Sequence, residues 1–553
     1  MRDLIKQILK NKPRTEKELL GLKRRAAKKS GRPILPNSEI SQEYFRLVND
    51  GQAKIDPKLE KLLRKRATRT LSGVAPVAVL TKPWKCPGKC AFCPTEKNVP
   101  KSYLSNEPAV MRAIRNKYNP YEQARSRLAA LEINGHRPEK IELIVIGGTW
   151  SALPRAYKYW FIKECFRAAN EFGPHSTKHI TYNKKTVKFS AVKKQLFLEQ
   201  KKNEKAKYKI IGITLETRPD YINEKELIQM RELGATRVEL GVQAINDKIL
   251  AKNQRGHGVA EIARATALLR AFGFKITYHL MPGLPGATAK KDLAMFKKIF
   301  SDPRFQPDQL KFYPTVVTAG SLLYKWWKAG KYKPYSDKVL EKLIIACKKN
   351  TPKYVRIIRL IRDIPAESII AGNKITNLRQ VLRQKGVKCR CIRCREAREQ
   401  KISAKNLKLN IIKYSAQGGR EYFISFDSRD GKILYGFCRL RLPAKLKMKI
   451  SKWKIKEEKF LFLNSSALVR ELHIYGELVP VGGGKTPLSS PLRKGGENQH
   501  AGLGKKLLAE AEKIARQNGY QQIAVIAGIG ARGYYKKFGY LPKDSYLCKK
   551  IVG

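Results

Sequence analysis

The segment Cys86-Pro-Gly-Lys-Cys90-Ala-Phe-Cys93 decides how this chain of 553 residues is interpreted. It follows a short apolar run at 77–80, so we predict a loop directly after a β-strand. Three thiolates on one loop can hold three irons of a 4Fe–4S cluster, and the fourth iron then has no protein ligand. The amine and carboxylate of a bound molecule can fill that position. The alternative is a structural zinc knuckle that lacks its fourth ligand.

Strand-like and helix-like segments alternate from residue 76 to about 315. The strand-like segments are short and rich in Val, Ile and Leu, as buried parallel strands are. This alternation predicts an α/β fold with about six β/α units, a partial TIM-like (βα)6 barrel within 76–385. Residues 316–385 are expected to be mostly helical. The expected strands are 77–80, 140–147, 210–216, 237–243, 275–281 and 309–313, and the expected helices are 110–133, 156–170, 224–233 and 259–272.

A three-cysteine loop after the first strand of a β/α barrel resembles the radical S-adenosylmethionine superfamily. In such barrels the chemistry gathers at the C-terminal ends of the strands. By this resemblance Cys86, Cys90 and Cys93 carry the cluster and begin the catalysis. The resemblance also implies an S-adenosylmethionine pocket lined by strand-end residues, namely Gly147, Gly148, Glu216, Gln243 and Met281-Pro282-Gly283. Each strand-end residue could instead be an ordinary turn or core residue.

The pattern changes at about residue 408, which predicts a second, mixed α/β domain over 408–553. A long strand is expected at 468–481, a helix at 504–517 and a strand at 522–527. The helix opens in the motif Gln499-x-x-Gly502-x-Gly504, whose glycines let backbone N–H groups approach a pyrophosphate beside the positive end of a helix.

The order of strand, glycine loop, helix and the pair Tyr534–Tyr535 resembles the GNAT acetyltransferases, which bind acetyl-coenzyme A. By this resemblance a tyrosine of the pair reaches the cofactor sulfur. The alternative is a packed surface loop with core tyrosines. The stretch 482–498, GGGKTPLSSPLRKGGEN, is interpreted as an insertion before the glycine loop, and we expect it to be disordered or a surface flap.

A second cysteine group, Cys389-Arg-Cys391-Ile-Arg-Cys394, lies in a linker at 386–407. Three thiols so close together favour a structural zinc site, which needs four ligands. Cys438, on a predicted hairpin strand, is the nearest unassigned candidate for the fourth ligand. The alternative is a set of free thiols in a basic loop.

The charge of the chain predicts a polyanionic partner. Lys and Arg total 114 against 46 Asp and Glu, which gives a net charge of +68. Such a field favours nucleic acid and predicts salt-dependent binding. Residues 1–75 are expected to form a basic helical arm that offers positive charge to phosphates, although they could be only a solvated charged surface. No run of 18 apolar residues and no secretory signal is evident, so we expect a cytoplasmic protein without membrane contact.

The combination of a radical S-adenosylmethionine barrel and a GNAT domain resembles the catalytic subunit family of Elongator and its single-chain bacterial and archaeal relatives. The resemblance covers nearly the whole chain. The segments that carry it are Asn106–Tyr121, Ile213-Thr-Leu-Glu-Thr-Arg-Pro-Asp-Tyr221, Gln254-Arg-Gly-His257, Arg362-Asp-Ile-Pro365 and Arg470-Glu-Leu-His-Ile-Tyr-Gly476.

This resemblance implies a tRNA-modifying enzyme that installs a 5-carboxymethyl group on wobble uridine 34, with residues 1–75 as its tRNA-binding arm. The implied cofactors are a 4Fe–4S cluster, S-adenosylmethionine, acetyl-coenzyme A and zinc. In that family a 5′-deoxyadenosyl radical takes hydrogen from the acetyl methyl group, the resulting carbon radical adds to C5 of uridine, and thioester hydrolysis releases the product. The resemblance leaves open whether the chain acts as a monomer, as a homodimer or with Elongator-like partner subunits.

Cofactor-binding roles carry over residue by residue. Lys140 matches a lysine that touches acetyl-coenzyme A from the barrel side, and Tyr535 matches a cofactor-contacting tyrosine with a catalytic role. In the family, the pantetheine of acetyl-coenzyme A lies along one strand, to which these residues correspond: Glu471, Leu472, His473 and Ile474. The loop that binds the pyrophosphate in the family corresponds to Gln499, Gly502, Leu503, Gly504 and Lys505.

Two other functions compete with this interpretation. A protein lysine acetyltransferase would use the barrel only as a scaffold, but a scaffold needs no open iron, and a strongly positive surface repels a basic peptide. A non-catalytic tRNA-binding protein with degenerate sites is the second alternative.

Overall fold

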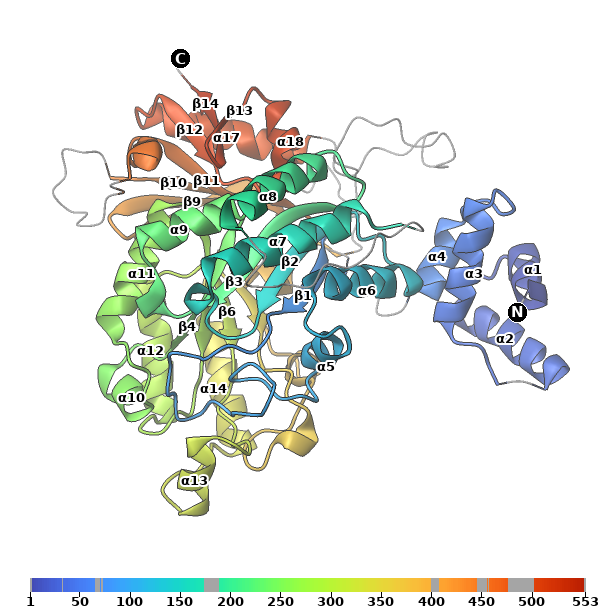
Figure 1. Cartoon of the computed structure of the whole chain (residues 1–553), viewed down its shortest axis with the longest axis horizontal. Coiled ribbons are helices and arrows are strands. Elements are labelled where there is room, and N and C mark those ends of the chain that lie inside the picture. The colour runs from blue at the N-terminus through green and yellow to red at the C-terminus, as the bar shows by residue number, and fades with distance from the viewer. Residues whose placement is uncertain are drawn as a thin grey trace.

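The computed structural model describes residues 2–31, 33–64, 70, 73–173, 188–398, 407–444, 455, 457–475 and 502–551. Figure 1 shows a small group of N-terminal helices beside a central α/β barrel, and a C-terminal domain stacked on one end of that barrel. Within the described ranges, no helix is both long and apolar enough to cross a membrane.

The central sheet is an open half-barrel. Its seven strands are parallel and follow chain order, so the predicted fold class is confirmed, with one strand more than expected. The extra strand, β7, lies in the segment that was expected to be mostly helical. The strands are β1 (Ala75–Leu80), β2 (Lys140–Ile146), β3 (Lys209–Thr217), β4 (Arg237–Gln243), β5 (Lys275–Leu280), β6 (Gln309–Phe312) and β7 (Arg356–Arg359).

Helices cover the outer face of this sheet (Figure 1). The predicted helix at 110–133 is two helices, α5 (Pro108–Arg115) and α6 (Pro120–Ile133), because a proline disfavours helical backbone in the residue before it and starts a new helix instead. Asn119 caps α6 by accepting from the N–H groups of Tyr121 and Glu122. The other helices of the barrel include α7 (Arg155–Asn170), α8 (Phe189–Asn203), α9 (Glu224–Glu232), α10 (Asp247–Lys252), α11 (Val259–Ala271), α12 (Ala289–Ser301), α13 (Leu322–Lys328) and α14 (Asp337–Lys349).

The C-terminal domain is built on a second seven-stranded sheet, in the order β13-β14-β12-β11-β10-β9-β8. Its strands are antiparallel except for the pair β11 and β12. The predicted strand 468–481 is seen only to Ile474, and 476–501 lies outside the described residues. The elements are β8 (Leu407–Ala416), β9 (Gly419–Ser428), β10 (Leu434–Leu442), β11 (Ala467–Ile474), α17 (Leu503–Gln517), β12 (Gln522–Val525), α18 (Arg532–Lys536), β13 (Leu541–Lys543) and β14 (Tyr546–Lys550).

The N-terminal helices form a small unit with its own apolar core. Leu4, Ile8, Leu19 and Tyr44 are among its buried residues. The unit touches the barrel through α3 and α6, and Glu60 pairs with Arg137 at 2.9 Å. Its helices are α1 (Arg2–Asn11), α2 (Glu16–Ser30), α3 (Asn37–Asn49) and α4 (Pro57–Leu63).

Buried charges join the C-terminal domain to the barrel. Arg470 of β11 donates to Asp308, which precedes β6 (3.0 Å), and to Glu421 of β9 (2.9 Å). Arg270 of α11 lies 3.4 Å from Asp308, and Arg441 of β10 donates to Glu421 (2.9 Å). These five side chains are at most 5% exposed. Because stripping a buried charge of its partner costs about 3–5 kcal/mol, the cluster holds the two domains in one arrangement.

The tightest backbone approach between the domains gives a test of this arrangement. A Cβ atom on Gly528 would lie 2.0 Å from the carbonyl oxygen of Ile211 in β3. Gly528→Ala should therefore push the domains apart and destabilise the protein by about 1–3 kcal/mol, seen as a lower melting temperature. Gly533→Ala is the matched control, because nothing lies within 4 Å of that Cβ position. Equal melting temperatures for the two variants would contradict this prediction.

Candidate active site

The three cysteines of the decisive segment lie on the loop that follows β1, at the C-terminal edge of the barrel sheet. Cys86, Cys90 and Cys93 all line one large cavity of about 1140 Å³. The loop is anchored to its surroundings: Ala91 donates its N–H to the carbonyl of Asn253 (3.1 Å) and accepts from the N–H of Leu323 (2.7 Å). The barrel therefore presents three thiols on a fixed loop at one end of an internal space.

Positive groups surround the buried thiol of Cys90. Arg255 Nη1 donates to its sulfur at 3.0 Å, and Arg218 Nη1 does so at 3.7 Å. The hydrogen bond from Cys93, assisted by these two guanidinium groups, lowers the pKa of Cys90 to about 5 in spite of burial. A thiolate is the form of cysteine that binds metal, so the surroundings fit a metal ligand.

The predicted strand-end residues gather at the same edge. Gly148, Glu216 and Gln243 line the cavity beside the cysteines. Gly147 and Gly148 both have left-handed backbone (φ 131° and 96°), and a Cβ on Gly147 would lie 2.2 Å from Thr81 Oγ1. Glu216 accepts a hydrogen bond from the hydroxyl of Tyr103 (3.0 Å). The Oε1 atom of Gln243 is buried without a hydrogen-bond partner among the described residues.

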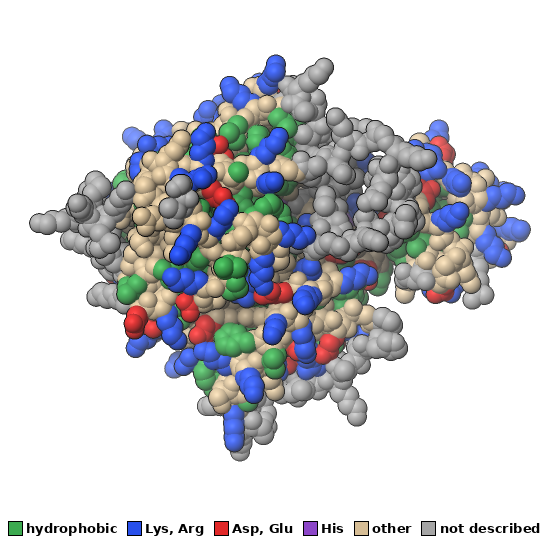
Figure 2. All heavy atoms as spheres, turned by 90° about the horizontal axis from the view of Figure 1, so that it is seen from above, with side chains coloured by type: hydrophobic (Ala, Val, Ile, Leu, Met, Phe, Trp, Pro, Cys, Tyr) green, Lys and Arg blue, Asp and Glu red, His purple; other side chains and the backbone are tan. Residues whose placement is uncertain are grey.

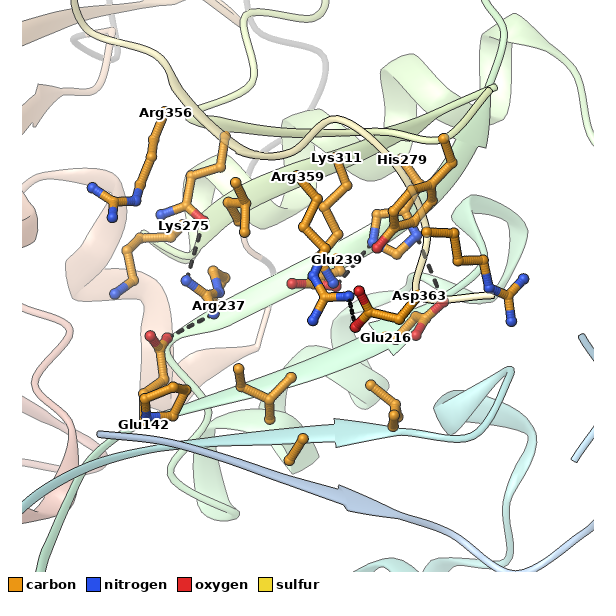
Figure 3. A pocket seen from close by; sticks show the side chains of 18 of the residues that line it. Glu142, Glu216, Arg237, Glu239, Lys275, His279, Lys311, Arg356, Arg359 and Asp363 are labelled. Carbon is orange, nitrogen blue, oxygen red and sulfur yellow. Dashed lines mark hydrogen bonds and ion pairs between the residues drawn. The ribbon is translucent and has the colours of Figure 1, made fainter. Parts of the chain in front are cut away.

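Charged side chains line the interior of the barrel, as Figure 3 shows. Glu239 is bound by Lys311 and by His279 Nε2 (2.9 Å). The charge of Lys311 and the hydrogen bond with His279 hold the pKa of the Glu239 carboxyl well below the usual range against the effect of burial. Glu142 pairs with Arg237 (2.9 Å) nearer the N-terminal ends of the strands. The interior is therefore a polar channel and not an apolar core.

The other end of the cavity is closed by the C-terminal domain. Glu471, Leu472 and His473 of β11 line it, and so does Tyr535 of α18. Lys275, at the start of β5, lies 3.6 Å from Glu471. This ion pair connects the part of the lining that comes from the barrel with the part that comes from β11. One continuous space thus runs from the three-cysteine loop through the barrel to β11. Ile474 and Tyr534 do not take part in its lining.

Strand β11 separates from its neighbour beside this space. β11 and β12 pair only over Ala467–Val469 and Ile523–Val525. Beyond Val469, the described residues give β11 a pairing strand only on the β10 side. The unpaired side of Glu471–Ile474 therefore offers backbone groups to an extended ligand, as the predicted pantetheine strand requires.

The remaining residues predicted to bind acetyl-coenzyme A lie outside the cavity lining. Leu503, Gly504 and Lys505 form the first turn of α17, and Gly502 precedes it with left-handed backbone (φ 92°). Lys140 begins β2, and burial lowers its pKa. Gln499 lies outside the described residues.

The second cysteine group is compact. The sulfurs of Cys389, Cys391 and Cys394 all lie within 4.8 Å of one another, close to the spacing of about 3.8 Å that a tetrahedral Zn–S site requires. Hydrogen bonds from Cys389 and Cys394 lower the pKa of Cys391. The three sulfurs on the loop after β1 do not all lie so close together, although Cys90 and Cys93 are hydrogen-bonded to each other.

Cys438 is not the fourth member of this group, so the prediction that it binds zinc is wrong. It lies on β10, fully buried in the apolar core between the second sheet and α17. Its neighbours Phe437 and Arg439 line the cavity on the opposite face. Because side chains alternate along a strand, Cys438 must point away from that face.

Several lining residues were not assigned a role from the sequence. Arg218 and Arg255 lie in two of the segments that carry the family resemblance, 213–221 and 254–257, but the sequence predicted no function for either of them. No role was predicted for Glu239, His279 or Lys311. The alternation of polar and apolar residues along the strands could have indicated these inward-facing side chains. In β5, for example, Lys275 and His279 alternate with apolar residues, which marks one face as polar.

Positive side chains outnumber negative ones on the face of the molecule that Figure 2 shows. Figure 2 shows Lys and Arg spread over the C-terminal domain and the N-terminal helices, with fewer Asp and Glu between them. This distribution agrees with the net charge of +68 and gives a polyanion many points of approach.

Comparison with known proteins agrees with this geometry. The model "Radical SAM superfamily" matches residues 85–299, and "Radical_SAM C-terminal domain" matches 307–386. A "tRNA uridine(34) acetyltransferase" of Dehalococcoides mccartyi is 43% identical over 88% of this chain and 100% of its own length. "Elongator complex protein 3" of Bos taurus is 36% identical over 99% of this chain and 96% of its own. The solved structure of archaeal Methanocaldococcus infernus Elp3, with an N-terminal deletion (1–46), has a TM-score of 0.68 and 38% identity, covering 86% of this chain and 99% of that one.

Asp292 of α12 orders the turn that follows β5 at the cysteine end of the cavity. Its carboxyl accepts from the N–H of Gly283 (2.8 Å) and from the hydroxyl of Tyr335 (2.8 Å). Burial raises the pKa of Asp292 to about 6. Because this value lies above that of an unfolded Asp, about 3.9, the fold favours the protonated carboxyl, and its contribution to stability is lost as the pH rises from about 4 to 6.

Asp292→Asn is neutral at every pH and can accept the same two hydrogen bonds. We therefore expect its stability relative to the native protein to rise by about 1.4 kcal/mol between about pH 5 and about pH 7.5, because about half of the total loss in the native protein has already occurred at pH 5. The melting temperatures of both proteins at the two pH values test this. Asp302→Asn is the control: the pKa of Asp302 is lowered by Arg304, so its penalty should be the same at both values. A pH-independent difference for Asp292→Asn would contradict the prediction.

Proposed function

The chain belongs to the family of the tRNA uridine(34) acetyltransferases and Elongator complex protein 3, and we propose from this premise that it modifies the wobble uridine of tRNA. The product that we propose is 5-carboxymethyluridine, made from S-adenosylmethionine and acetyl-coenzyme A. The observation that carries the proposal is the single cavity that connects the loop of Cys86, Cys90 and Cys93 with β11 and Tyr535. It lets two cofactors react inside one protected space.

Residues at the C-terminal edge of the barrel would hold the radical-generating group. Cys86, Cys90 and Cys93 would bind the 4Fe–4S cluster, with Arg255 and Arg218 stabilising the thiolate of Cys90. When bound, the cluster and S-adenosylmethionine would supply a radical able to remove hydrogen from an acetyl methyl group and so make that carbon reactive toward a uridine base. We assign the strand-end residues Gly147, Gly148, Glu216 and Gln243 to the S-adenosylmethionine pocket.

The C-terminal domain would present the acetyl thioester to the barrel. The unpaired side of Glu471–Ile474 would align the pantetheine, and Tyr535 would lie beside the thioester because it lines the cavity. The N-terminus of α17, at Gly502–Lys505, would bind the pyrophosphate, with Gln499 and Lys140 as further contacts. Hydrolysis of the thioester after carbon–carbon bond formation would leave the carboxymethyl group on the base.

A structural zinc ion is the best occupant for Cys389, Cys391 and Cys394. Their sulfurs have the spacing of a mononuclear site, and they lie between the barrel and the second sheet in sequence. This ion would organise the segment between α15 (Leu378–Gln384) and β8. The fourth ligand is not Cys438.

The protein acetyltransferase alternative is not favoured. The predicted thioester position opens into the barrel interior, because Glu471, His473 and Tyr535 line the same cavity as the cysteine loop. The positive charge also favours RNA over a basic peptide. With tRNA as its substrate, the protein would act in the cytoplasm.

Anaerobic assembly tests the proposed function. The native protein, purified without oxygen, should load iron and sulfide, and tRNA incubated with it and both cofactors should contain 5-carboxymethyluridine by nucleoside mass spectrometry. The triple variant Cys86→Ser, Cys90→Ser and Cys93→Ser should lose the iron and the product, because serine does not replace a thiolate ligand. Cys548→Ser, at a buried cysteine outside the cavity, should retain both. Product formation by an iron-free protein would overturn the proposal.

The adjacent tyrosines Tyr534 and Tyr535 form a second, matched test. Tyr535→Phe should lower the rate of tRNA-stimulated acetyl-coenzyme A hydrolysis by about 100-fold, since its hydroxyl would act on the thioester as one positioned proton donor. Tyr534→Phe should change that rate much less, because Tyr534 does not line the cavity. Release of coenzyme A, followed with a thiol reagent, measures both. Equal losses in the two variants would contradict the role assigned to Tyr535.

A further inference from the structure

The half-barrel has an open seam between its two edge strands. β1 and β7 stand at opposite ends of the strand order and do not pair with each other. The cavity reaches this seam, because Pro76 and Ala78 of β1 line it on one side and Arg356 and Ile358 of β7 line it on the other. Among the described residues, the cavity therefore extends to a side of the sheet that is not closed by strand pairing.

Most positive side chains that line the cavity already have a negative partner. Arg237 pairs with Glu142 at 2.9 Å, and Lys311 pairs with Glu239. The same holds along the seam, where three arginines near β7 have carboxylates in reach. These pairs are Arg356–Glu396 (2.8 Å), Arg359–Asp363 and Arg362–Glu107 (3.2 Å). Such pairs leave little net charge for a ligand to neutralise.

Besides Arg255, which donates to Cys90, four arginines line the cavity without a carboxylate partner among the described residues. They lie on and beside α15 and α16 (Ile392–Arg395), the elements next to β7, and we name them the arginine rim: Arg379, Arg383, Arg393 and Arg398. Within the part of the chain that the structure describes, no carboxylate oxygen lies within 4.0 Å of any of them, and Arg379 donates only to the carbonyl of Ile357 (2.8 Å). All four are at least partly exposed.

We propose that the arginine rim binds the phosphates of a single-stranded RNA loop at the β1–β7 seam, so that one nucleotide enters the cavity between the flanking phosphates. This inference rests on the proposed function, and it names the place where the substrate backbone is held. A planar guanidinium group binds a phosphate through two parallel hydrogen bonds, which a row of arginines can repeat along a strand.

The depth of the cavity favours a single strand over a duplex. The cysteine loop and β11 line an internal space, so a base must leave its stack to reach them, and an unpaired loop base does so at the lowest cost. The basic N-terminal helices α1–α4 lie to one side of the barrel, against α6 (Figure 1). An RNA stem on those helices and its loop on the rim would divide the binding between the two parts of the protein.

Binding of a labelled RNA to the whole protein tests the rim without any chemistry. The probe is a fluorescent stem–loop RNA with uridine in its loop, compared with a fully paired duplex of similar length. For Arg383→Gln combined with Arg393→Gln, we expect stem–loop binding to weaken about tenfold or more. The slope of log K against log salt should also become shallower by about 1.4, since each single-strand phosphate contributes about 0.7. Duplex binding should change little.

A charge-matched control lies in the same segment. Lys374→Gln combined with Lys388→Gln removes the same charge from exposed residues that do not line the cavity. This pair should leave the affinity for the stem–loop and its salt slope close to native. The melting temperature of each variant shows whether it folds, and Arg383→Gln alone, at an exposed position, gives a second variant if the double change unfolds the protein.

The possible results separate the inference from the proposed function. Equal losses in the rim pair and the lysine pair, or equal losses for stem–loop and duplex, would overturn the rim as a specific site. Displacement of the stem–loop by a polyglutamate peptide at equal charge would also overturn it, in favour of an acidic protein segment. If the rim pair loses stem–loop binding while native protein makes no modified uridine, the rim stands and the proposed reaction fails. If native protein makes the product and the rim pair binds normally, only this inference fails.

Discussion

The buried ion cluster between the two domains is the constraint on which the rest of this structure depends. Asp308 from the barrel and Glu421 from the second sheet share the guanidinium group of Arg470, and all three are hidden from solvent. Neither domain could bury these charges alone without a large cost. The arrangement therefore sets β11 across the N-terminal end of the barrel, and the internal channel exists only because that end is covered by this strand.

Much of this architecture could be predicted from the sequence because its signals are local. The spacing of Cys86, Cys90 and Cys93 after an apolar run is a short-range pattern, and so is the glycine motif that opens α17. Strand β7 was missed because four residues between helices carry too little periodic signal. Cys438 was assigned by elimination from its nearness in sequence, and strand alternation turned its side chain into the opposite core.

The charges inside the barrel could not be interpreted in the same way. Glu239, His279 and Lys311 come from three strands, so their mutual neutralisation is a tertiary fact that no single segment contains. Once the strands are in register, the same alternation that places apolar residues against the helices places these groups inward. Their pairing makes the interior polar yet nearly neutral, which suits a space that must accept charged cofactors without holding them by net charge alone.

The charges that line the cavity differ between its interior and the seam. Inside the barrel they form neutral ion pairs, whereas the arginine rim at the seam has no carboxylate partner among the described residues. The two ends of the cavity are already committed, one to the cysteine loop and the other to β11 with Tyr535. A third reactant can then come from the side, where the described edge strands β1 and β7 do not pair with each other. The surplus positive charge stands at that same seam. Under the proposed function this geometry brings the radical source, the acetyl donor and the RNA together from three directions, so no reactant has to pass another before the reaction begins.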